Sequence, residues 1–502
     1  MNNEFLRNLK EQNNYTYTEN GAVAHKTTMS NVYDMFAFAG AYRSRSEEDC
    51  ILLFKKAYEE NPRLALKCLF YMRDIRGGQG ERRFFRTCLK WLAKDYPFVA
   101  ARVMKFVPEY GRYDDLYSFV GTPVENAMFS FLNDIIKTDL ESLKTNENSG
   151  ISLCAKWLKS ENASSPETIA LGEKTRKAFK LSHKQYRKTL SILRNRINIV
   201  ERLMSENRWG EIEFDKIPSK AGFVYRNAFA KHDADRYKDF IESKDSKVKA
   251  STLYPYEIVR KVTQKITGYN CYINLTETER EVLNKYWENL PDYLDGKVCK
   301  ILNVIDTSGS MQNGGYGKVA PIDVAISLGL YCSERIGGDF RNLFISFASS
   351  PRFIEVEGID FVDKVRRIYA QNLCDNTNLE ATFELLKNTI LKNNIPNEDI
   401  PDTLVVISDM EIDNGSYWRS DLRIATEMEA IREDWEKHGL IMPHLVYWNV
   451  NARNNIILDK YDNSVSYVSG CSPIIFKSIL TGKTGQELML ETLESERYKD
   501  IE

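Results

Sequence analysis

The chain has 502 residues, of which 69 are Lys or Arg and 71 are Asp or Glu, so its formal net charge is −2. A chain of this length can bury the cores of two or more domains. The balance of charge excludes a protein coated uniformly with positive charge, so any nucleic-acid site must be a local patch. The hydrophobic content of 43% is ordinary for a globular protein.

The N-terminus, MNNEFLRNLKEQNN, has no apolar stretch of the kind that secretory signals carry. No run approaches the ~20 apolar residues of a membrane helix. The nine cysteines stand singly between Cys50 and Cys471, without the paired spacing of a zinc site. This usage favours free thiols in a reducing compartment, so we expect a cytoplasmic protein with no membrane partner.

After a polar segment over residues 1–30, helical patterns begin at Val32. Ser46 precedes three acidic residues and is typical of an N-cap. Pro62 suits the first position of the next helix, and Pro97 opens another. Short joints between these helices favour antiparallel hairpins, and we expect an α-helical, HEAT-like repeat domain over residues 31–290, although no clean sequence period proves it.

The stretch Arg73–Arg83, RDIRGGQGERR, is rich in glycine and arginine. It lacks the Gly-Lys-Ser/Thr ending of a phosphate loop and follows no buried strand, which argues against nucleotide binding. One interpretation is a turn between helices with capping glycines. The other is a surface on which Arg73, Arg76, Arg82 and Arg83 contact phosphates.

The charge is most unbalanced between Leu171 and Trp209, a stretch that contains 11 Lys or Arg residues but only three Glu. At about 100° per residue, one helix face carries the apolar residues Tyr186, Leu190, Leu193, Ile197, Val200 and Met204. The opposite half carries Lys184, Arg187, Lys188, Arg194 and Arg202. This half is either a solvated basic face or a surface that contacts RNA phosphates.

Leu290–Gly296, LPDYLDG, marks a domain boundary, and from residue 297 to 502 strand and helix patterns alternate. Such alternation predicts a doubly wound, Rossmann-like, mostly parallel sheet. Strands are expected at 298–305, 342–347, 352–357 (an edge strand), 403–409, 443–449 and 465–469. Helices are expected at 321–336, 361–369, 379–392 and 420–438.

Oxygen-bearing side chains follow two of these strands. Ile301–Met311, ILNVIDTSGSM, ends its strand at Asp306 and continues to Ser308 and Ser310. A polar loop carries Thr377, and the strand in TLVVISDME ends at Asp409. Carboxylate and hydroxyl oxygens at the carboxyl ends of buried strands suit a hard divalent cation such as Mg²⁺.

Together these five positions resemble the metal-ion-dependent adhesion site (MIDAS) of von Willebrand factor type A domains. The resemblance implies that Asp306, Ser308, Ser310, Thr377 and Asp409 surround Mg²⁺, or another divalent cation such as Mn²⁺ or Ca²⁺. It further implies an open coordination position for a partner's carboxylate. Asp375-Asn376 replaces the usual Gly-Gly before the Thr, and Asp375 and Glu411 would tune the cation from outside its ligand shell.

Most of the chain is similar to a related uncharacterised family of plants, large viruses and bacteria or phage, and in its architecture it resembles the Ro (TROVE) RNA-binding proteins. The similarity lies in YMRDIRGGQGERR (71–83), PEYGRYDDL (108–116), AKWLKSEN (155–162), LSHKQYRK (181–188), IPSKA (217–221) and ISDMEID (407–413). It implies RNA binding and a monomeric ring of helical repeats closed by the type A domain. For a viral protein the compartment would be the virion or host cytoplasm.

The leading hypothesis is a non-enzymatic, Ro-like protein that binds small or non-coding RNA. The alternative is a metal-dependent scaffold or assembly factor whose MIDAS captures a partner's carboxylate, and the two can coexist. An enzyme ranks third because the five histidines show no nucleophile or metal-ligand spacing.

Overall fold

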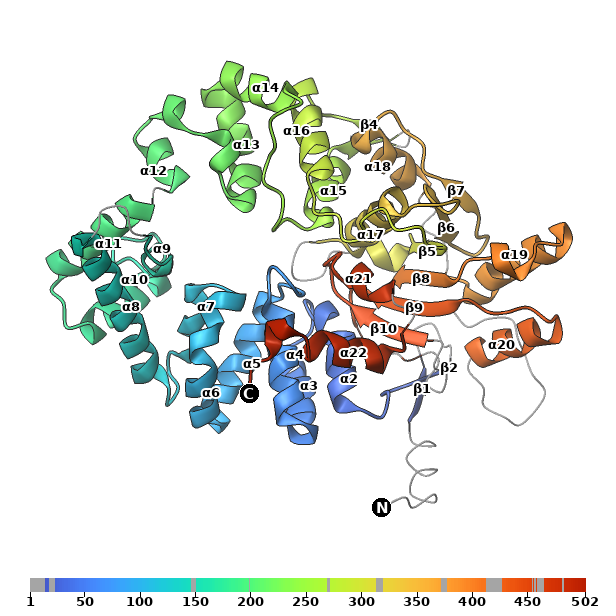
Figure 1. Ribbon diagram of the computed structural model, residues 1–502, viewed down its shortest axis with the longest axis horizontal. Helices are drawn as coiled ribbons and strands as arrows, with labels where there is room; N and C mark the ends of the chain where they lie inside the picture. Colours follow the sequence, from blue (N-terminus) through green and yellow to red (C-terminus); the bar gives the residue numbers. More distant parts are fainter. Residues whose placement is uncertain are drawn as a thin grey trace. The chain divides into compact units, whose positions relative to one another are not determined.

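The computed structural model describes residues 14–17, 23–145, 150–197, 199–268, 271–312, 319–371, 377–411, 427–453, 455, 457, 465–480 and 483–502. The chain forms two compact units (Figure 1). The first comprises residues 1–68, 77–79 and 250–499, and the second comprises residues 69–76, 80–249 and 500–502. The predicted combination of helical and α/β structure is confirmed, since most elements are helices and one six-stranded sheet lies in the first unit.

The sheet has the strand order β10-β9-β8-β5-β6-β7. The strands are β5 (Ile301–Asp306), β6 (Leu343–Phe347), β7 (Phe353–Glu355), β8 (Thr403–Ser408), β9 (His444–Asn449) and β10 (Val465–Ser469). All neighbours are parallel except β7, which is the antiparallel edge strand. Every residue of β5 and β8 is buried, which explains their continuous apolar sequences. The predicted strands are confirmed.

The predicted helices of the sheet region are also present: α17 (Pro321–Arg335), α18 (Phe361–Ala370), α19 (Leu379–Asn393) and α20 (Glu427–Lys437). Residues 420–426 of the last prediction lie outside the described residues. Helix α17 packs closely on β5 at Gly329, where a Cβ atom would lie 2.3 Å from Ile305 Cδ1. Any side chain at residue 329 would therefore push the helix off the central strand.

The N-terminal elements of the first unit reach the same sheet through α2 and η1, which contact β10 (Figure 1). They are β1 (Tyr15–Tyr17), β2 (Val23–His25), α2 (Asn31–Phe38), η1 (Ala39–Ala41) and α3 (Glu47–Glu60), followed by α4 (Pro62–Arg73). The Gly40 N–H donates to Ser469 Oγ of β10 at 3.1 Å. A Cβ atom on Gly40 would lie 2.5 Å from the Ser469 carbonyl oxygen, so this contact requires glycine.

The C-terminal helices α21 (Ile475–Ile479), α22 (Gly485–Leu493) and η8 (Glu496–Tyr498) complete this packing. Glu494 accepts from Arg63 Nη2 at 2.7 Å and from Lys67 Nζ at 2.5 Å. The Lys67 side chain is only 1% exposed, so this ion pair supplies a partner for a buried cation.

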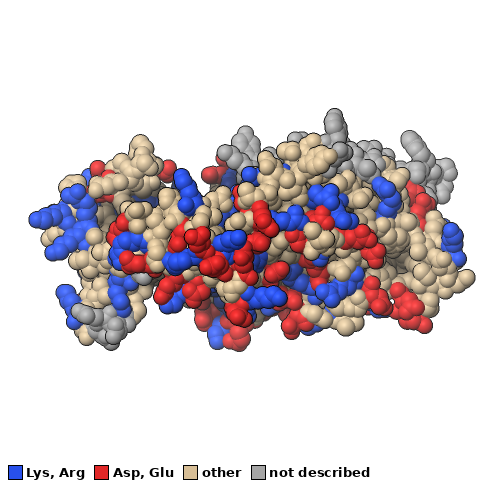
Figure 2. All heavy atoms as spheres, turned by 90° about the horizontal axis from the view of Figure 1, so that it is seen from above, with Lys and Arg blue, Asp and Glu red and all other residues tan. Residues whose placement is uncertain are grey.

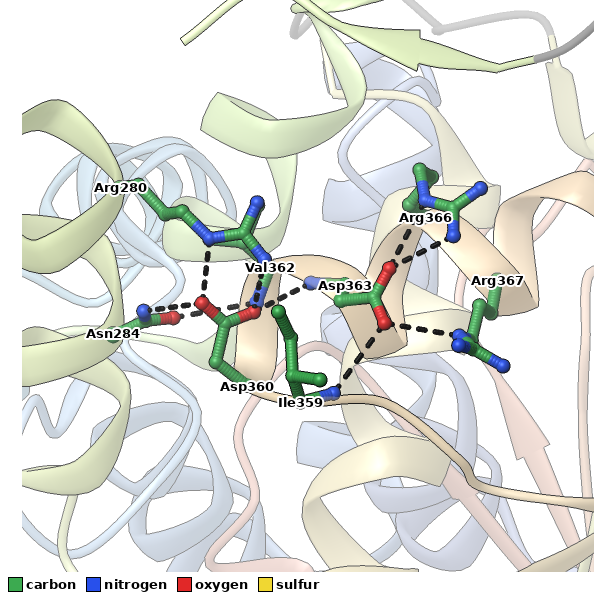
Figure 3. A network of polar contacts seen from close by, with 8 residues as sticks. All are labelled: Arg280, Asn284, Ile359, Asp360, Val362, Asp363, Arg366 and Arg367. Atoms are coloured by element: carbon green, nitrogen blue, oxygen red, sulfur yellow. Dashed lines mark hydrogen bonds and ion pairs between the residues drawn. The ribbon is translucent and has the colours of Figure 1, made fainter. Parts of the chain in front are cut away.

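The remaining elements of the first unit are α15 (Pro255–Thr263), β3 (Ile266–Thr267), β4 (Tyr272–Ile273) and α16 (Glu277–Glu288). Asp360, the N-cap of α18, fastens α18 to α16 (Figure 3). Its carboxylate accepts from Arg280 Nε and Nη2 at 2.6 and 2.7 Å, and from Asn284 Nδ2 at 2.8 Å. Burial alone would raise the pKa of Asp360, but the hydrogen bonds from Arg280, the Asp363 N–H and Asn284 hold it below its ordinary value.

We expect Asp360→Ala to lower the free energy of unfolding by about 2 kcal/mol at pH 7, because it removes a helix cap and the Arg280 pair. The native pKa is depressed, so this stability is present above the unfolded pKa. It is lost as the pH falls below about 4. Urea denaturation across pH measures the difference between wild type and variant. Asp339→Ala, at an exposed position, should change stability little, and equal effects of the two variants would contradict the assignment.

The second unit is helical throughout its described part, apart from its connecting loops and turns. Its helices are α5 (Arg82–Asp95), α6 (Pro97–Val103), η2 (Met104–Phe106), α7 (Val107–Tyr110), η3 (Tyr113–Phe119), α8 (Glu125–Thr145), α9 (Cys154–Trp157), α10 (Pro166–Ala178), α11 (His183–Ile197), α12 (Val200–Ser205), η4 (Trp209–Glu211), η5 (Phe214–Lys216), α13 (Ser219–His232) and α14 (Ala234–Glu242). No described helix of either unit is both long and apolar enough to cross a membrane.

A buried carboxylate, Asp115, holds the start of the second unit together. It accepts from Arg73 Nε at 2.8 Å, from Arg86 Nε at 2.6 Å and from the Arg112 N–H at 2.9 Å. The side chains of Asp115 and Arg73 are 0% and 1% exposed. Arg73 of the glycine- and arginine-rich stretch therefore belongs to the interior of the fold.

Candidate functional site

The first candidate site lies where the direction of sheet building reverses. From β5 the chain continues outward through β6 to β7, and β8 then returns to pair with the other side of β5. Asp306 ends β5, and Asp409 follows β8 directly. In doubly wound sheets such a switch point opens a crevice at the carboxyl ends of the strands, where ligands bind.

Hydrogen bonds link the predicted residues on the β5 side. Asp306 Oδ1 accepts from the Ser308 N–H at 2.8 Å, and Ser308 Oγ lies 2.9 Å from Ser310 Oγ. Asp306 Oδ2 accepts from Ser408 Oγ at 2.6 Å. Sequence reasoning missed Ser408. The parallel register of Ile305 with Ile407 places it beside Asp306, so aligned strand ends could have identified it.

On the β8 side, Thr377 Oγ1 donates to the Glu411 carbonyl at 3.2 Å, and the Glu411 N–H donates to Asp409 Oδ1 at 3.4 Å. Arg453 connects the two sides, since its Nη2 lies 3.4 Å from both Asp409 Oδ2 and the Ser310 carbonyl oxygen. No sequence motif indicated this arginine. Asp375, predicted to tune a cation, lies outside the described residues.

The electrostatics of this cluster suit a cation. Burial and the neighbouring Asp409 carboxylate raise the pKa of Asp306 to about 7, against the hydrogen bonds from Ser408 and Ser308. The side chains that could bind a cation here are two buried carboxylates and three hydroxyls, and all of them offer oxygen atoms of the kind that Mg²⁺ prefers. No group of three or more His, Cys, Asp or Glu gathers anywhere in the described ranges, this cluster included, so a cation here would need the hydroxyls as well as the two carboxylates. The residues present therefore fit a divalent cation.

The second candidate site is a hollow of about 410 Å³ on the second unit, which we call the basic groove. Its wall comes from α11, α12 and the segment after α9. The lining residues are Ser160, Glu161, Asn162, Tyr186, Arg187, Leu190, Ser191, Arg194, Asn195, Ile199 and Arg202. Three of the five predicted RNA-contacting residues thus meet in one concave surface.

The predicted basic residues differ in how they are held. Lys184, Arg187 and Lys188 are exposed, and the structure gives them no hydrogen bond or ion pair with a described residue. Arg194 instead donates to the Ala155 and Leu158 carbonyls at 2.9 and 2.8 Å, and to Ser160 Oγ at 2.8 Å. Arg194 therefore shapes the groove by fixing one of its walls.

Two further groups set the charge of the basic groove. Arg202 Nε lies 3.5 Å from Glu206. The groove carboxylate Glu161 accepts from Arg176 Nε at 2.7 Å and lies 3.1 Å from His183 Nδ1. Burial would raise the pKa of Glu161, but Arg176 and His183 hold it below its ordinary value. Its negative charge is thus engaged by neighbours outside the groove lining.

The surface of the second unit shows the same excess of positive charge. In Figure 2, Lys and Arg gather at the left end, which is the end that α8, α10 and α11 occupy in Figure 1. Acidic and basic side chains alternate over the middle of the face shown. Positive charge in this nearly neutral chain is therefore concentrated locally.

Comparisons with known proteins give two family models. Residues 300–501 match a domain of unknown function (DUF7788), and residues 18–120 and 158–297 match another (DUF2828). A curated relative, the uncharacterized protein L728 of Acanthamoeba polyphaga mimivirus, is 26% identical over 96% of this chain and 87% of its own length. The crystal structure of the Deinococcus radiodurans RO (RSR) protein is similar over 95% of each chain, at a TM-score of 0.37 and 14% identity.

Proposed function

We propose that this chain is a non-enzymatic, Ro-like RNA-binding protein that holds the backbone of a small or non-coding RNA in the basic groove. The observation that carries the proposal is the basic groove itself. It combines a concave surface with Arg187, Arg202 and the amides of Asn162 and Asn195. Guanidinium and amide donors of this kind contact phosphate and sugar oxygens without reading a base sequence.

The free cations around the basic groove give the proposal its energetic basis. Lys184, Arg187 and Lys188 are exposed, so an RNA strand would meet them without breaking an existing ion pair. Each phosphate contact releases condensed counterions, which favours association at low salt. The sequence resemblance to Ro proteins points to the same class of ligand.

The test is the affinity for a fluorescently labelled single-stranded RNA, measured by anisotropy across a salt series. If three cations contact phosphates, log K falls linearly with log salt with a slope of about −2. An affinity that is absent, or that does not change with salt, would contradict the proposal.

The Asp306 cluster favours a second function, divalent-cation-dependent capture of a protein partner. We propose that the sheet region is a von Willebrand type A domain whose MIDAS is formed by Asp306, Ser308, Ser310, Thr377 and Asp409. A cation bound there would offer an open coordination position to a partner's carboxylate. The chain's own residues would hold it through two carboxylates and three hydroxyls, with Ser408 orienting Asp306.

We expect Asp306→Asn to remove Mg²⁺ binding measured by calorimetry, because one of two buried carboxylates is neutralised. Asp402→Asn is the matched control, since Asp402 precedes β8 at its opposite end and its side chain is 66% exposed. Thermal unfolding without added metal separates loss of the site from loss of the fold. Equal Mg²⁺ binding by wild type and Asp306→Asn would contradict this function.

A further inference from the structure

A second group of cations on the second unit lies outside the basic groove. We call Arg73, Arg82, Arg86 and Arg112 the arginine cluster. Two carboxylates form ion pairs with this cluster. Asp115 pairs with Arg73 and Arg86, and Asp114 pairs with Arg86 at 2.9 Å and with Arg112 at 2.8 Å. Four guanidinium groups around two carboxylates leave two positive charges in excess.

Arg82 is the member of this cluster that forms no ion pair with a described residue. It is exposed, and it makes no hydrogen bond or ion pair with any described residue. Partial desolvation by the packing around its guanidinium lowers the pKa of Arg82, as do the charges of Arg112, Arg73 and Arg86, against the opposing Asp114 carboxylate. The fold thus holds one cation among three others, an arrangement whose repulsion a bound anion would relieve.

The arginine cluster and the basic groove both contact one short segment, residues 155–162. The Arg112 guanidinium of the cluster lies 4.0 Å from the centroid of the Trp157 ring. The carbonyls of Ala155 and Leu158 accept from Arg194 of the groove, and Ser160 and Asn162 line it. Ser160 is three positions after Trp157, which limits the distance between their Cα atoms to about 11 Å.

We propose that Arg82 and Arg86 of the arginine cluster bind phosphate groups of the same RNA strand that occupies the basic groove. This inference rests on the proposed function and extends its site past Trp157. It agrees with the second interpretation of the glycine- and arginine-rich stretch, in which its arginines contact phosphates. In this proposal Arg82 contacts the RNA, and the buried Arg73 supports the cluster from inside the fold. Arg86, whose side chain is 33% exposed, shares its carboxylates with its neighbours and retains access to solvent.

The experiment compares Arg82→Gln with Lys94→Gln. Both residues are exposed on α5 and lose one charge, but they lie 12 positions apart, about 18 Å along the helix. Arg82→Gln should weaken binding of single-stranded RNA about five-fold and make the salt slope less negative by about 0.7. Lys94→Gln should change neither. Equal melting temperatures of both variants and wild type would show that the fold is intact.

Each outcome decides between the claims. If wild type binds RNA with a steep salt dependence and Arg82→Gln behaves like Lys94→Gln, the arginine cluster is not part of the RNA site while the basic groove stands. If wild type shows no salt-dependent RNA affinity, the proposed function fails and the extension of its site fails with it.

Discussion

Reversal of three exposed charges of α11, Arg187 in the basic groove and Lys184 and Lys188 beside it, in a Lys184→Glu, Arg187→Glu, Lys188→Glu variant, is expected to weaken RNA binding on the order of 100-fold. The three side chains are exposed and make no ion pair with a described residue, so their replacement should leave the fold intact. The loss arises because three phosphate contacts disappear and three repulsive carboxylates replace them. Anisotropy at constant salt measures the change in Kd.

The matched control reverses three exposed cations elsewhere on the second unit: Lys90→Glu, Lys94→Glu and Arg102→Glu. Both variants change the net charge equally, so a general effect of charge would weaken both alike. We expect the control to lose only a few-fold in affinity, through the long-range field. Equal losses in the two variants would show that the RNA is held by net charge and not by the groove.

Asp115→Ala is expected to lower the free energy of unfolding by about 3–5 kcal/mol, the largest stability effect that we predict. Arg73 is 1% exposed, so removal of Asp115 leaves a buried guanidinium without its carboxylate. The hydrogen bonds from Arg86 and the Arg112 N–H are lost as well. Chemical denaturation followed by far-ultraviolet circular dichroism measures the change, because the second unit is helical.

Asp134→Ala is the control for this prediction. Asp134 lies on α8 of the same unit, its side chain is 69% exposed, and among the described residues its carboxylate pairs only with nearby Lys137 at 3.7 Å. Exposed pairs of this type contribute about 0–1 kcal/mol. A small effect of Asp115→Ala, comparable with that of Asp134→Ala, would contradict the buried-anchor role of Asp115.

The sheet could be predicted from the sequence because its strands are buried on both faces. β5 and β8 therefore appear as continuous apolar runs, and the predicted ends differ from the observed ones by at most three residues. The same ends place Asp306 and Asp409 at one edge of the sheet, so the strand order alone brings these two carboxylates to the same side, while Thr377 comes from the loop before α19. The cation itself stays a prediction.

Other features depend on contacts between residues distant in sequence, which local patterns do not encode. The close packing of Gly40 against Ser469 and the ion pair between Arg453 and Asp409 are two such contacts. Arg194 shows a different limit. Helical periodicity placed it correctly on the basic half of α11, but only the structure reveals that Ala155, Leu158 and Ser160 already use its guanidinium. Periodicity gives the face of a helix and not the partners of a long side chain.

The most direct test of RNA binding in the basic groove is ultraviolet crosslinking of bound single-stranded RNA, followed by mass spectrometry of the crosslinked peptides. We expect crosslinks in peptides that contain residues 155–162 and 183–202, and their loss in the Lys184→Glu, Arg187→Glu, Lys188→Glu variant. Crosslinks confined to the first unit, or unchanged by the charge reversal, would contradict the claim that the basic groove holds the RNA.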